Sequence, residues 1–315
     1  SMFVDKDIKK SISATDKDAQ YDEKAKNLLG HKIILAHILV KTIDEFKGMN
    51  PKDVVQYIEG EPYISTVPVD AGSTNVEKEQ DGEKVIGLNT ENSELNEGLV
   101  RFDIIFYVRM KDGLSQVIVN IEAQKAEPSA YDIINRAVFY ISRMISSQKG
   151  REFVNSNYND IKRVYSIWVC MNMSQNCMNY IHFTQESVVG TYQWKGDIDL
   201  ANIVLIGLAE DLPEKEERYE LHRLLGALLS AKLDVNTKLD IIGNEFDIPL
   251  ESDIRKDVND MCNLSQGIKE QAYVEGTENG IAIGKQEGIT IGKQEGIAET
   301  IIKMSRKGYE AEQIS

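Results

Sequence analysis

Hydrophobic residues recur every three or four positions between residues 17 and 47, which is the spacing of one face of an α-helix. Gly30 lies within this segment and is a position at which the helix can divide in two. Asn50 and Pro51 then indicate the start of a short helix, because proline is tolerated in a first helical turn. The chain is therefore expected to begin its regular structure with helices.

Alternating hydrophobic and polar positions predict a β-hairpin between residues 101 and 124. Its first strand reads RFDIIFYVRM, the turn signal is KDG, and the second strand reads LSQVIVNIEAQ. Residues 131–148 then repeat hydrophobic positions with helical spacing. The patterns that follow predict strands at 161–172, 178–189 and 199–210 and a helix at 213–231. This order of helices and strands predicts an α/β domain with a central mixed sheet flanked by helices.

Two segments do not follow these patterns. Residues 70–98 are polar and acidic, which favours a long loop or an insertion at the edge of the sheet. From Gly276 to Gly296 a glycine falls at every fourth position, within the repeated units GIAIGKQE and GITIGKQE. Because glycine costs about 1 kcal/mol per helical position relative to alanine, one interpretation is a flexible or weakly helical tail. The other is a helix whose glycines let a partner helix approach closely, as in an oligomerising stem.

These patterns divide the chain into three parts. We expect a main domain over residues 1–240, a helical segment over 241–266 and a glycine-repeat tail over 267–315.

Composition restricts the partners of the protein. A formal charge of −15 argues against a surface that coats nucleic acid by electrostatics alone, so DNA binding needs a local basic patch or bridging cations. No apolar run of about 18 residues is present, so no membrane span is expected. The N-terminal residues have no apolar signal core, and three cysteines are a sparse set that indicates reduced thiols. We therefore expect a cytoplasmic protein.

One face of the second hairpin strand is unusually polar. Asn120, Glu122 and Gln124 lie side by side on it, because side chains of a strand alternate between its two faces. If the two-residue turn is 112–113, Asp103 of the first strand lies directly opposite Glu122, with Cβ atoms about 4.5–5.5 Å apart. A three-residue loop with a bulge would break this register.

Two opposed carboxylates repel each other and are costly to desolvate. A cation, a shared proton or an Arg or Lys neighbour must compensate, and Arg101 is one candidate because the same register places it opposite Gln124. Oxygen ligands with room for water suit Mg²⁺ or Mn²⁺ better than zinc. The alternative is that both acids, near strand ends, are simply solvated. The spacing is therefore compatible with a divalent-metal site without requiring one.

Several stretches resemble a known family. Phe102-Asp103, followed nineteen residues later by EAQ at 122–124, resembles the PD-(D/E)XK nuclease motif in its ExQ variant. The wider pattern resembles the PD-(D/E)XK nuclease family transposases, also called recombination-promoting nucleases. YDEKAKNLL resembles the D-x-x-x-K helix of that family, YDIINRAVFYISRMISSQ the helix after its metal strand, and RVYSIWVCMN its next core strand. With the glycine repeats, the resemblance covers roughly residues 17–300.

This resemblance implies a restriction-endonuclease-like core and a Mg²⁺- or Mn²⁺-dependent endodeoxyribonuclease that acts on DNA in recombination or transposition. Asp103 and Glu122 would bind the metal, and Asp22 on the first helix would complete the acidic cluster, with Lys26 one turn later as a substrate contact. Gln124 stands where most relatives have a catalytic lysine. Since a neutral amide can orient water but cannot stabilise developing charge as an ammonium does, the alternative is a catalytically weak DNA-binding or self-assembling protein.

The helix at 131–148 supplies three further candidates. Arg136, Tyr140 and Arg143 form one stripe at i, i+4 and i+7, opposite four apolar residues, namely Ile134, Val138, Ile141 and Ile145. The stripe would contact DNA phosphates, with Arg136 as the preferred residue, or it would be a solvated face with ordinary salt bridges.

Overall fold

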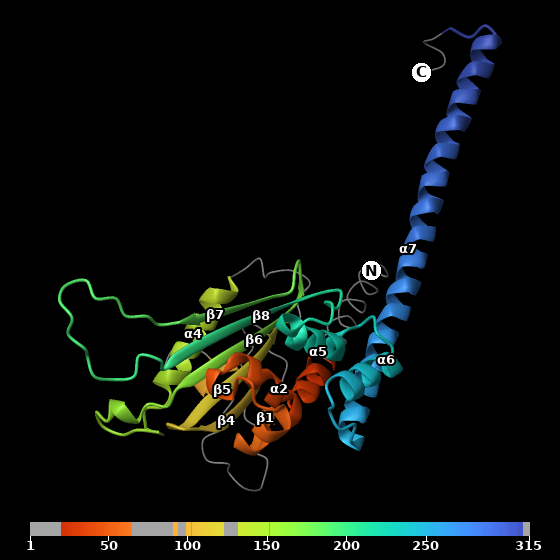
Figure 1. Ribbon diagram of the computed structural model, residues 1–315. Helices are drawn as coiled ribbons and strands as arrows, with labels where there is room; N and C mark the ends of the chain where they lie inside the picture. Colours follow the sequence, from red (N-terminus) through yellow and green to blue (C-terminus); the bar gives the residue numbers. More distant parts are fainter. Residues whose placement is uncertain are drawn as a thin grey trace. The chain divides into compact units, whose positions relative to one another are not determined.

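The computed structural model describes residues 20–64, 91–93, 99–101, 103–122, 132–150 and 152–310 (Figure 1). For residues 91–93, 99–101, 121 and 122 it describes the main chain alone. The chain forms two compact units, which meet between residues 264 and 265. The predicted loop at 70–98 lies outside the described residues, except for the short strand β2 (Glu91–Ser93), which pairs with β3 (Leu99–Arg101).

A mixed sheet of six strands forms the centre of the first unit, in the order β1-β4-β5-β6-β8-β7 (Figure 1). β5, β6 and β8 run parallel to one another, and the other pairs are antiparallel. The strands are β1 (Ile58–Ile64), β4 (Ile104–Met110), β5 (Gly113–Glu122), β6 (Val164–Met173), β7 (Cys177–His182) and β8 (Ala201–Ala209). The predicted α/β class with a mixed sheet is therefore confirmed.

Helices cover both faces of this sheet. Helix 20–29, α2 (Lys32–Thr42), α5 (Glu220–Leu229) and the first turns of α7 (Ser252–Arg306) share one hydrophobic core with the sheet. α4 (Ile133–Ser146) packs on the other face in a second core. Val119 belongs to the first core and Ile118 to the second, as strand alternation requires. β5 is thus buried on both faces.

The remaining short helices connect these elements. They are η1 (Asp44–Phe46), α3 (Pro51–Val54), η2 (Val55–Tyr57), η3 (Tyr158–Asp160), η4 (Glu217–Tyr219), α6 (Val235–Asp240) and the π-helical η5 (Ile241–Glu245). The side chain of Asn50 caps α3 by accepting a 3.0 Å hydrogen bond from the main-chain nitrogen of Lys52, which confirms the predicted helix start.

The predicted first helix divides at Gly30. Helix 20–29 ends directly before it, and α2 begins two residues later. A Cβ atom at Gly30 would lie 2.4 Å from Cδ1 of Ile64, so a larger residue there would require the β1 side chain to shift. Close packing between the end of helix 20–29 and Ile64 of β1 explains why a glycine occupies position 30.

The hairpin register differs from the prediction. Met110 pairs with Gly113 and Ile104 with Val119, so the turn is 111–112 rather than 112–113. One further step along this register places Asp103 opposite Asn120, and the predicted pairing of Asp103 with Glu122 is wrong. The KDG signal is compatible with either turn position, and Gly113, at a φ of 111°, begins the second strand. Because the shift equals one full pair, each side chain keeps its predicted face.

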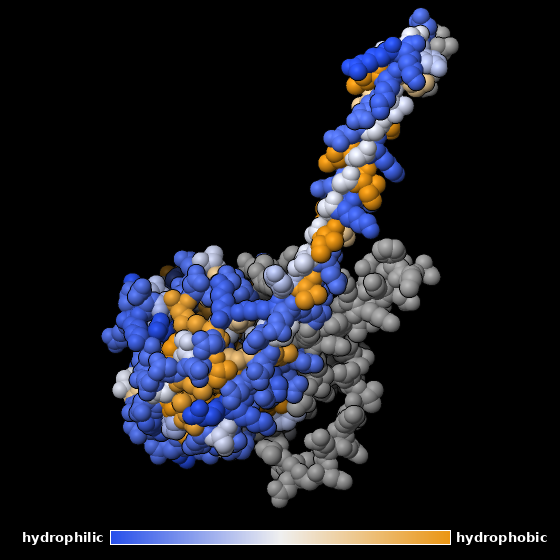
Figure 2. Space-filling model, turned by 90° about the vertical axis from the view of Figure 1, so that its right-hand side faces the viewer, coloured by the Kyte–Doolittle hydropathy of each residue, from blue (hydrophilic) through white to orange (hydrophobic). Residues whose placement is uncertain are grey.

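The second unit contains the rest of α7, which is helical through the whole glycine repeat. The isoleucines from Ile281 to Ile302 are exposed, and Figure 2 shows hydrophobic patches that alternate with hydrophilic ones along this helix. None of the helices that the structure describes is both long and apolar enough to cross a membrane.

Candidate functional site

A buried lysine joins two carboxylates at the end of the hairpin. Helix 20–29 presents Asp22 and Lys26 one turn apart, and Asp103 directly precedes β4. Nζ of Lys26 lies 2.5 Å from Oδ2 of Asp22 and 3.1 Å from Oδ1 of Asp103. Lys26 is only 2% exposed and Asp103 is also buried. The sequence left the compensating group for Asp103 open, and the structure provides a lysine from the first helix.

The electrostatics of this cluster keep the lysine charged. Burial opposes the charge of Lys26, but the carboxylates of Asp103 and Asp22 outweigh it and raise the pKa of the ammonium above its ordinary value. The ammonium therefore remains protonated at neutral pH. Removing one member of such a buried set leaves a charge without compensation, which is far more costly than losing a surface ion pair.

The strand partner of Asp103 is a buried asparagine. The main-chain N–H of Asp103 donates a 3.3 Å hydrogen bond to Oδ1 of Asn120. Asn120 is 4% exposed and lies within β5, where it pairs with Trp168 of β6. The side chain of Asn120 thus connects β5 to the residue before β4. This contact lies one pair beyond Ile104 and Val119, the last pair of the main-chain ladder.

Glu122 and Gln124 extend the same face of β5. The main chain of Glu122 is the last residue of β5 and pairs with Cys170, whereas the side chain of Glu122 and all of Gln124 lie outside the described residues. In the observed register Asp103 is a diagonal neighbour of Glu122. Diagonal neighbours in an antiparallel pair are about 7–8 Å apart and within reach of long side chains. The two acids remain candidates for one site, although they are not directly opposed.

The polar stripe on α4 faces the sheet rather than the solvent. The guanidinium carbon of Arg136 lies 5.0 Å from the ring centre of Tyr140 and 5.4 Å from that of Trp168. Nη2 of Arg136 donates a 3.1 Å hydrogen bond to the Tyr140 hydroxyl group. Arg143 is buried, with its guanidinium carbon 5.9 Å from the ring centre of Phe139. The alternative of a solvated stripe is therefore wrong for Arg143, and Arg136 and Tyr140 are partly buried.

The apolar residues predicted opposite this stripe do not all face the core. Ile134 is 51% exposed and Val138 is also exposed, whereas Ile141 is buried. Helical spacing groups residues by face, but it does not say which face meets the sheet when both carry apolar groups. Trp168 lies on β6, where it pairs with Asn120 of β5. Because Arg136 stacks on Trp168, its guanidinium lies over β6, the strand next to the polar face of β5.

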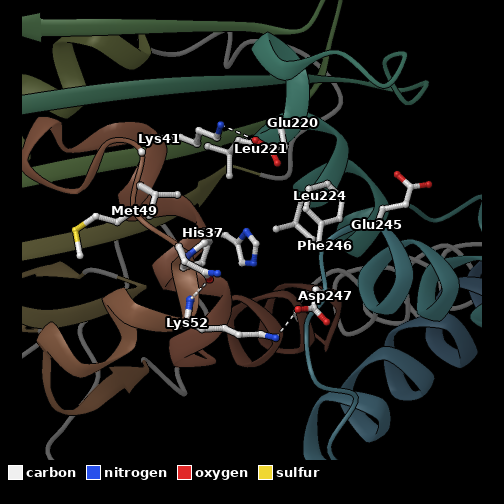
Figure 3. Close-up of a pocket in the computed structure, with 14 residues that line it drawn as sticks. His37, Lys41, Met49, Lys52, Glu220, Leu221, Leu224, Glu245, Phe246 and Asp247 are labelled. Carbon is white, nitrogen blue, oxygen red and sulfur yellow. Dashed lines mark hydrogen bonds and ion pairs between the residues drawn. The ribbon is translucent and has the colours of Figure 1, made fainter.

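A separate pocket of about 400 Å³ lies between α2, α5 and residues 245–247 (Figure 3). Two ion pairs with 2.5 Å separations lie at its rim, one between Lys41 and Glu220 and the other between Lys52 and Asp247. His37 lies among its lining residues, and burial lowers the pKa of this imidazole to about 4. None of the lining residues belongs to the cluster around Lys26. The sequence contains no motif that would have indicated this pocket.

Within the described part of the chain, no group of three or more His, Cys, Asp or Glu side chains is arranged to hold a metal ion. Asp22 and Asp103 supply only oxygen donors, which fit Mg²⁺ or Mn²⁺, and they share the ammonium of Lys26. A complete metal site would need a further ligand such as Glu122. Comparison with protein-family models, curated proteins and solved structures finds no match to this chain.

Proposed function

We propose that this protein is a divalent-metal-dependent DNA endonuclease with a restriction-endonuclease-like core, which acts in recombination or transposition. The buried cluster of Asp22, Lys26 and Asp103 is the observation that carries the proposal. Charged side chains are almost never fully buried unless they are paired, and buried charged clusters occur preferentially at functional sites. The resemblance of these residues and of EAQ at 122–124 to the nuclease motif gives the cluster its assigned chemistry.

The position of the cluster in the sheet supports a binding site. Glu122 lies at the carboxyl end of β5, which is followed in the sheet by the parallel strands β6 and β8. Ligands of open α/β sheets bind outside the carboxyl ends of parallel strands. Asp103 directly precedes the antiparallel β4 and therefore lies at the same end of the sheet.

In this proposal, Asp103 and Glu122 bind Mg²⁺ or Mn²⁺, and Asp22 completes the acidic cluster. The bound ion would polarise the phosphoryl oxygen and lower the pKa of the attacking water. Gln124 orients that water. Lys26 holds the two carboxylates in place; because its side chain is only 2% exposed, the direct phosphate contact that the resemblance implies for it is not part of the proposal. Since three of these residues are acidic and one is basic, the bound cation would have to supply the positive charge that a DNA site on a protein of charge −15 requires.

α4 would supply the remaining substrate contacts. Arg136, held against Tyr140 and Trp168, would steady the phosphate, and Arg143 would support the same side of α4. The protein would act in the cytoplasm, where the thiols of its free cysteines persist in reduced form. We also propose that the glycine-repeat segment of α7 assembles copies of the chain into a homo-oligomer.

Nicking of a supercoiled plasmid in the presence of Mg²⁺ or Mn²⁺ tests the proposed activity. We expect Asp103→Asn and Glu122→Gln to lower the cleavage rate at least about 100-fold, since each would remove a metal ligand. Asp247→Asn, which changes an ion pair at the distant pocket, serves as the matched control and should cleave as wild type. If the wild-type protein cleaves DNA no faster than Asp103→Ala, the proposed enzymatic activity is wrong.

One observation favours a second candidate function. The ammonium of Lys26 pairs with both Asp22 and Asp103, and such pairing is also what a purely structural cluster would show. A catalytically weak DNA-binding or self-assembling protein would retain the same cluster. The two functions differ in their response to metal: Mg²⁺ should raise the melting temperature of a working nuclease but not that of its Glu122→Ala variant.

A further inference from the structure

The two edges of the six-stranded sheet are protected to very different degrees. β1 forms one edge and β7 forms the other. An edge strand presents unpaired N–H and C=O groups, and proteins usually block such an edge with charged residues, proline or a bulge. β1 carries all three: Glu59 and Glu61, Pro62, and an irregularity in its register between Glu59 and Tyr63. β1 is therefore poorly suited to pair with another chain.

β7 carries none of these protections. Its sequence, CMNYIH, contains no acidic residue, lysine, arginine or proline, and its pairing with β8 is regular along its whole length. Nε2 of His222 lies 2.8 Å from the carbonyl oxygen of Cys177, at the start of the strand. Among the described residues, no main-chain hydrogen bond joins 178–182 to any element other than β8. Met178 and Tyr180 are also exposed, so the outer edge of β7 is open to a further strand.

The segment that follows β7 exposes large hydrophobic side chains. Residues 183–200, the β7–β8 loop, connect the two strands without regular secondary structure, and Figure 1 shows this loop extending beyond the sheet. Val188 and Val189 are 91% and 94% exposed, and three aromatic side chains are exposed as well, namely Phe183, Tyr192 and Trp194. Loops longer than about 12–15 residues are uncommon and usually functional, and exposed hydrophobic patches mark interaction sites. The loop thus adds a hydrophobic surface to the open edge.

The charge of this surface indicates which partner it can accept. Residues 173–196 contain one acidic residue, Glu186, and one basic residue, Lys195, although the whole chain has 51 acidic and 36 basic residues. Such a segment offers no cluster of lysine and arginine to a nucleic acid and no opposite charge to a strongly charged protein. Copies of a chain with a charge of −15 repel one another, and the repulsion is least where each copy presents an uncharged surface. A second copy of this chain meets that condition.

Pairing with a second copy also satisfies the main chain of β7. Two copies related by a two-fold axis present the same surface to each other, so no second binding sequence is needed. Two β7 strands that meet edge to edge across such an axis run antiparallel. In an antiparallel pair, the N–H and C=O groups of both strands bond to each other. The same groups that are open at the edge of one copy are therefore the partners that the other copy requires.

We propose that the outer edge of β7 and the β7–β8 loop bind the same surface of a second copy, so that two six-stranded sheets continue through an antiparallel pair of β7 strands. This contact is separate from the one proposed for α7 and does not depend on nuclease activity. β7 has only six residues, so the contact is small. Since interfaces of standard size have dissociation constants of about 1 µM or below, this one should dissociate above that range. At lower concentrations, a chain without the α7 contact is a monomer.

Sedimentation equilibrium of the full-length chain tests this contact. Ile289→Asp serves as the background, because it weakens the contact through α7. We expect this chain to change from monomer to dimer as its concentration rises from about 1 µM to about 1 mM. Adding Met178→Lys should weaken the dimer at least about 10-fold, because an edge lysine opposes strand pairing and the two-fold axis brings like charges together. Asn179→Lys, at an exposed position on the other face of β7, should have the same effect and covers the case in which the first variant does not fold.

The matched control is Tyr63→Lys on the protected edge. Tyr63 and Met178 are both 43% exposed, and the two substitutions change the charge equally. Tyr63→Lys should therefore dimerise as the background does. A background chain that stays a monomer up to about 1 mM would overturn the proposal. Equal dimerisation of the lysine variants of β7 and β1 would overturn it as well, because the copies would then meet through another surface or through none.

Discussion

Nζ of Lys26 lies 3.1 Å from Oδ1 of Asp103, and this contact joins the first helix of the domain to the start of β4. The same ammonium also contacts Asp22, one helical turn away. A single buried cation thus connects the first helix to the residue that precedes β4. Lys26 therefore stabilises the fold, and in the proposed metal site it would compensate the same carboxylates as the ion.

Replacing this lysine should destabilise the protein in a metal-dependent way. We expect Lys26→Met to lower the free energy of unfolding by about 3–5 kcal/mol, because the buried carboxylate of Asp103 and the partly buried one of Asp22 lose their counter-ion. If the cluster binds metal, Mg²⁺ should restore part of that loss, since the ion would compensate Asp22 and Asp103 in place of the ammonium. Urea unfolding with and without Mg²⁺ measures both effects.

A second buried lysine provides the control for that experiment. Lys238 is fully buried on α6, and its Nζ donates 3.1 Å to the carbonyl oxygen of Leu228. Lys238→Met should also be destabilising, but Mg²⁺ should not restore its stability. Equal responses of the two variants to Mg²⁺ would contradict a metal site at Asp103.

The inward-facing arginine of α4 leads to a second prediction. Arg136→Ala should weaken DNA binding and reduce stability by about 1–2 kcal/mol, because it removes two cation–π contacts of about 0.5–1 kcal/mol each. Trp168 should report the change by its fluorescence, measured in a Trp194→Phe background so that only one tryptophan contributes. DNA affinity is measured by titration of a labelled duplex.

The matched control is Arg218, which stacks on Tyr219 with 4.9 Å between the guanidinium carbon and the ring centre. This pair lies at the start of α5, away from the polar face of β5. Arg218→Ala should leave both DNA affinity and Trp168 fluorescence unchanged. If the two alanine variants bind DNA equally well, Arg136 has no part in the site.

Much of the fold follows from local patterns in the sequence. Alternation of apolar residues identifies β5 and β6 and assigns their side chains to faces, because the period of a strand is two residues. Gly30 and Pro51 similarly mark a helix break and a helix start. Each of these features depends on residues close together in the chain.

The candidate site was less predictable because it depends on contacts between distant segments. A register shift of one pair moves Asp103 from Glu122 to Asn120 without changing any face, so alternation cannot detect it. The turn signal KDG is compatible with both registers. The burial of Lys26 against Asp103 depends on how the first helix packs on the sheet, which no local pattern specifies.

His37, which lines the pocket between α2 and α5, predicts that the stability of the protein depends on pH. Burial lowers the pKa of His37 to about 4 from its ordinary value of about 6.5, so the folded protein holds a neutral imidazole that the unfolded chain would protonate. The unfolded state therefore binds more protons between about pH 6.5 and pH 4, and stability falls as the pH decreases through this range. By pH 5 the loss attributable to His37 amounts to about 2 kcal/mol.

His37→Gln should reduce this acid sensitivity, because a glutamine cannot be protonated in the unfolded state. Urea unfolding of wild type and variant at pH 8 and pH 5 gives the comparison, and the difference between the two pH values should be about 2 kcal/mol smaller for the variant. An equal difference in both proteins would show that the imidazole is as readily protonated in the fold as in the unfolded chain. The variant also leaves the ion pair between Lys41 and Glu220 in place, so a change cannot be assigned to that pair.

The glycine repeat of α7 raises the question of what stabilises it as a helix. Six glycines from Gly276 to Gly296 cost about 1 kcal/mol each relative to alanine. Most helical stability in proteins comes from packing of an apolar face. Ile281, Ile289 and Ile297 recur at the same position of the eight-residue pattern and are exposed. A second copy of the same helix would cover them, and the glycines would let the two backbones approach closely.

A shortened chain tests whether this helix assembles the protein. Full-length protein should have the mass of an oligomer in light scattering, and a chain that ends at Gly267 should have the mass of a monomer. Ile289→Asp in the full-length chain should also lower the mass, because it places a charge among the isoleucines that would be buried between copies. Glu287→Gln, a change at an exposed polar position of the same repeat, is the control and should leave the mass unchanged. Equal masses for the full-length and shortened chains, after allowance for the removed residues, would exclude the segment as the site of assembly.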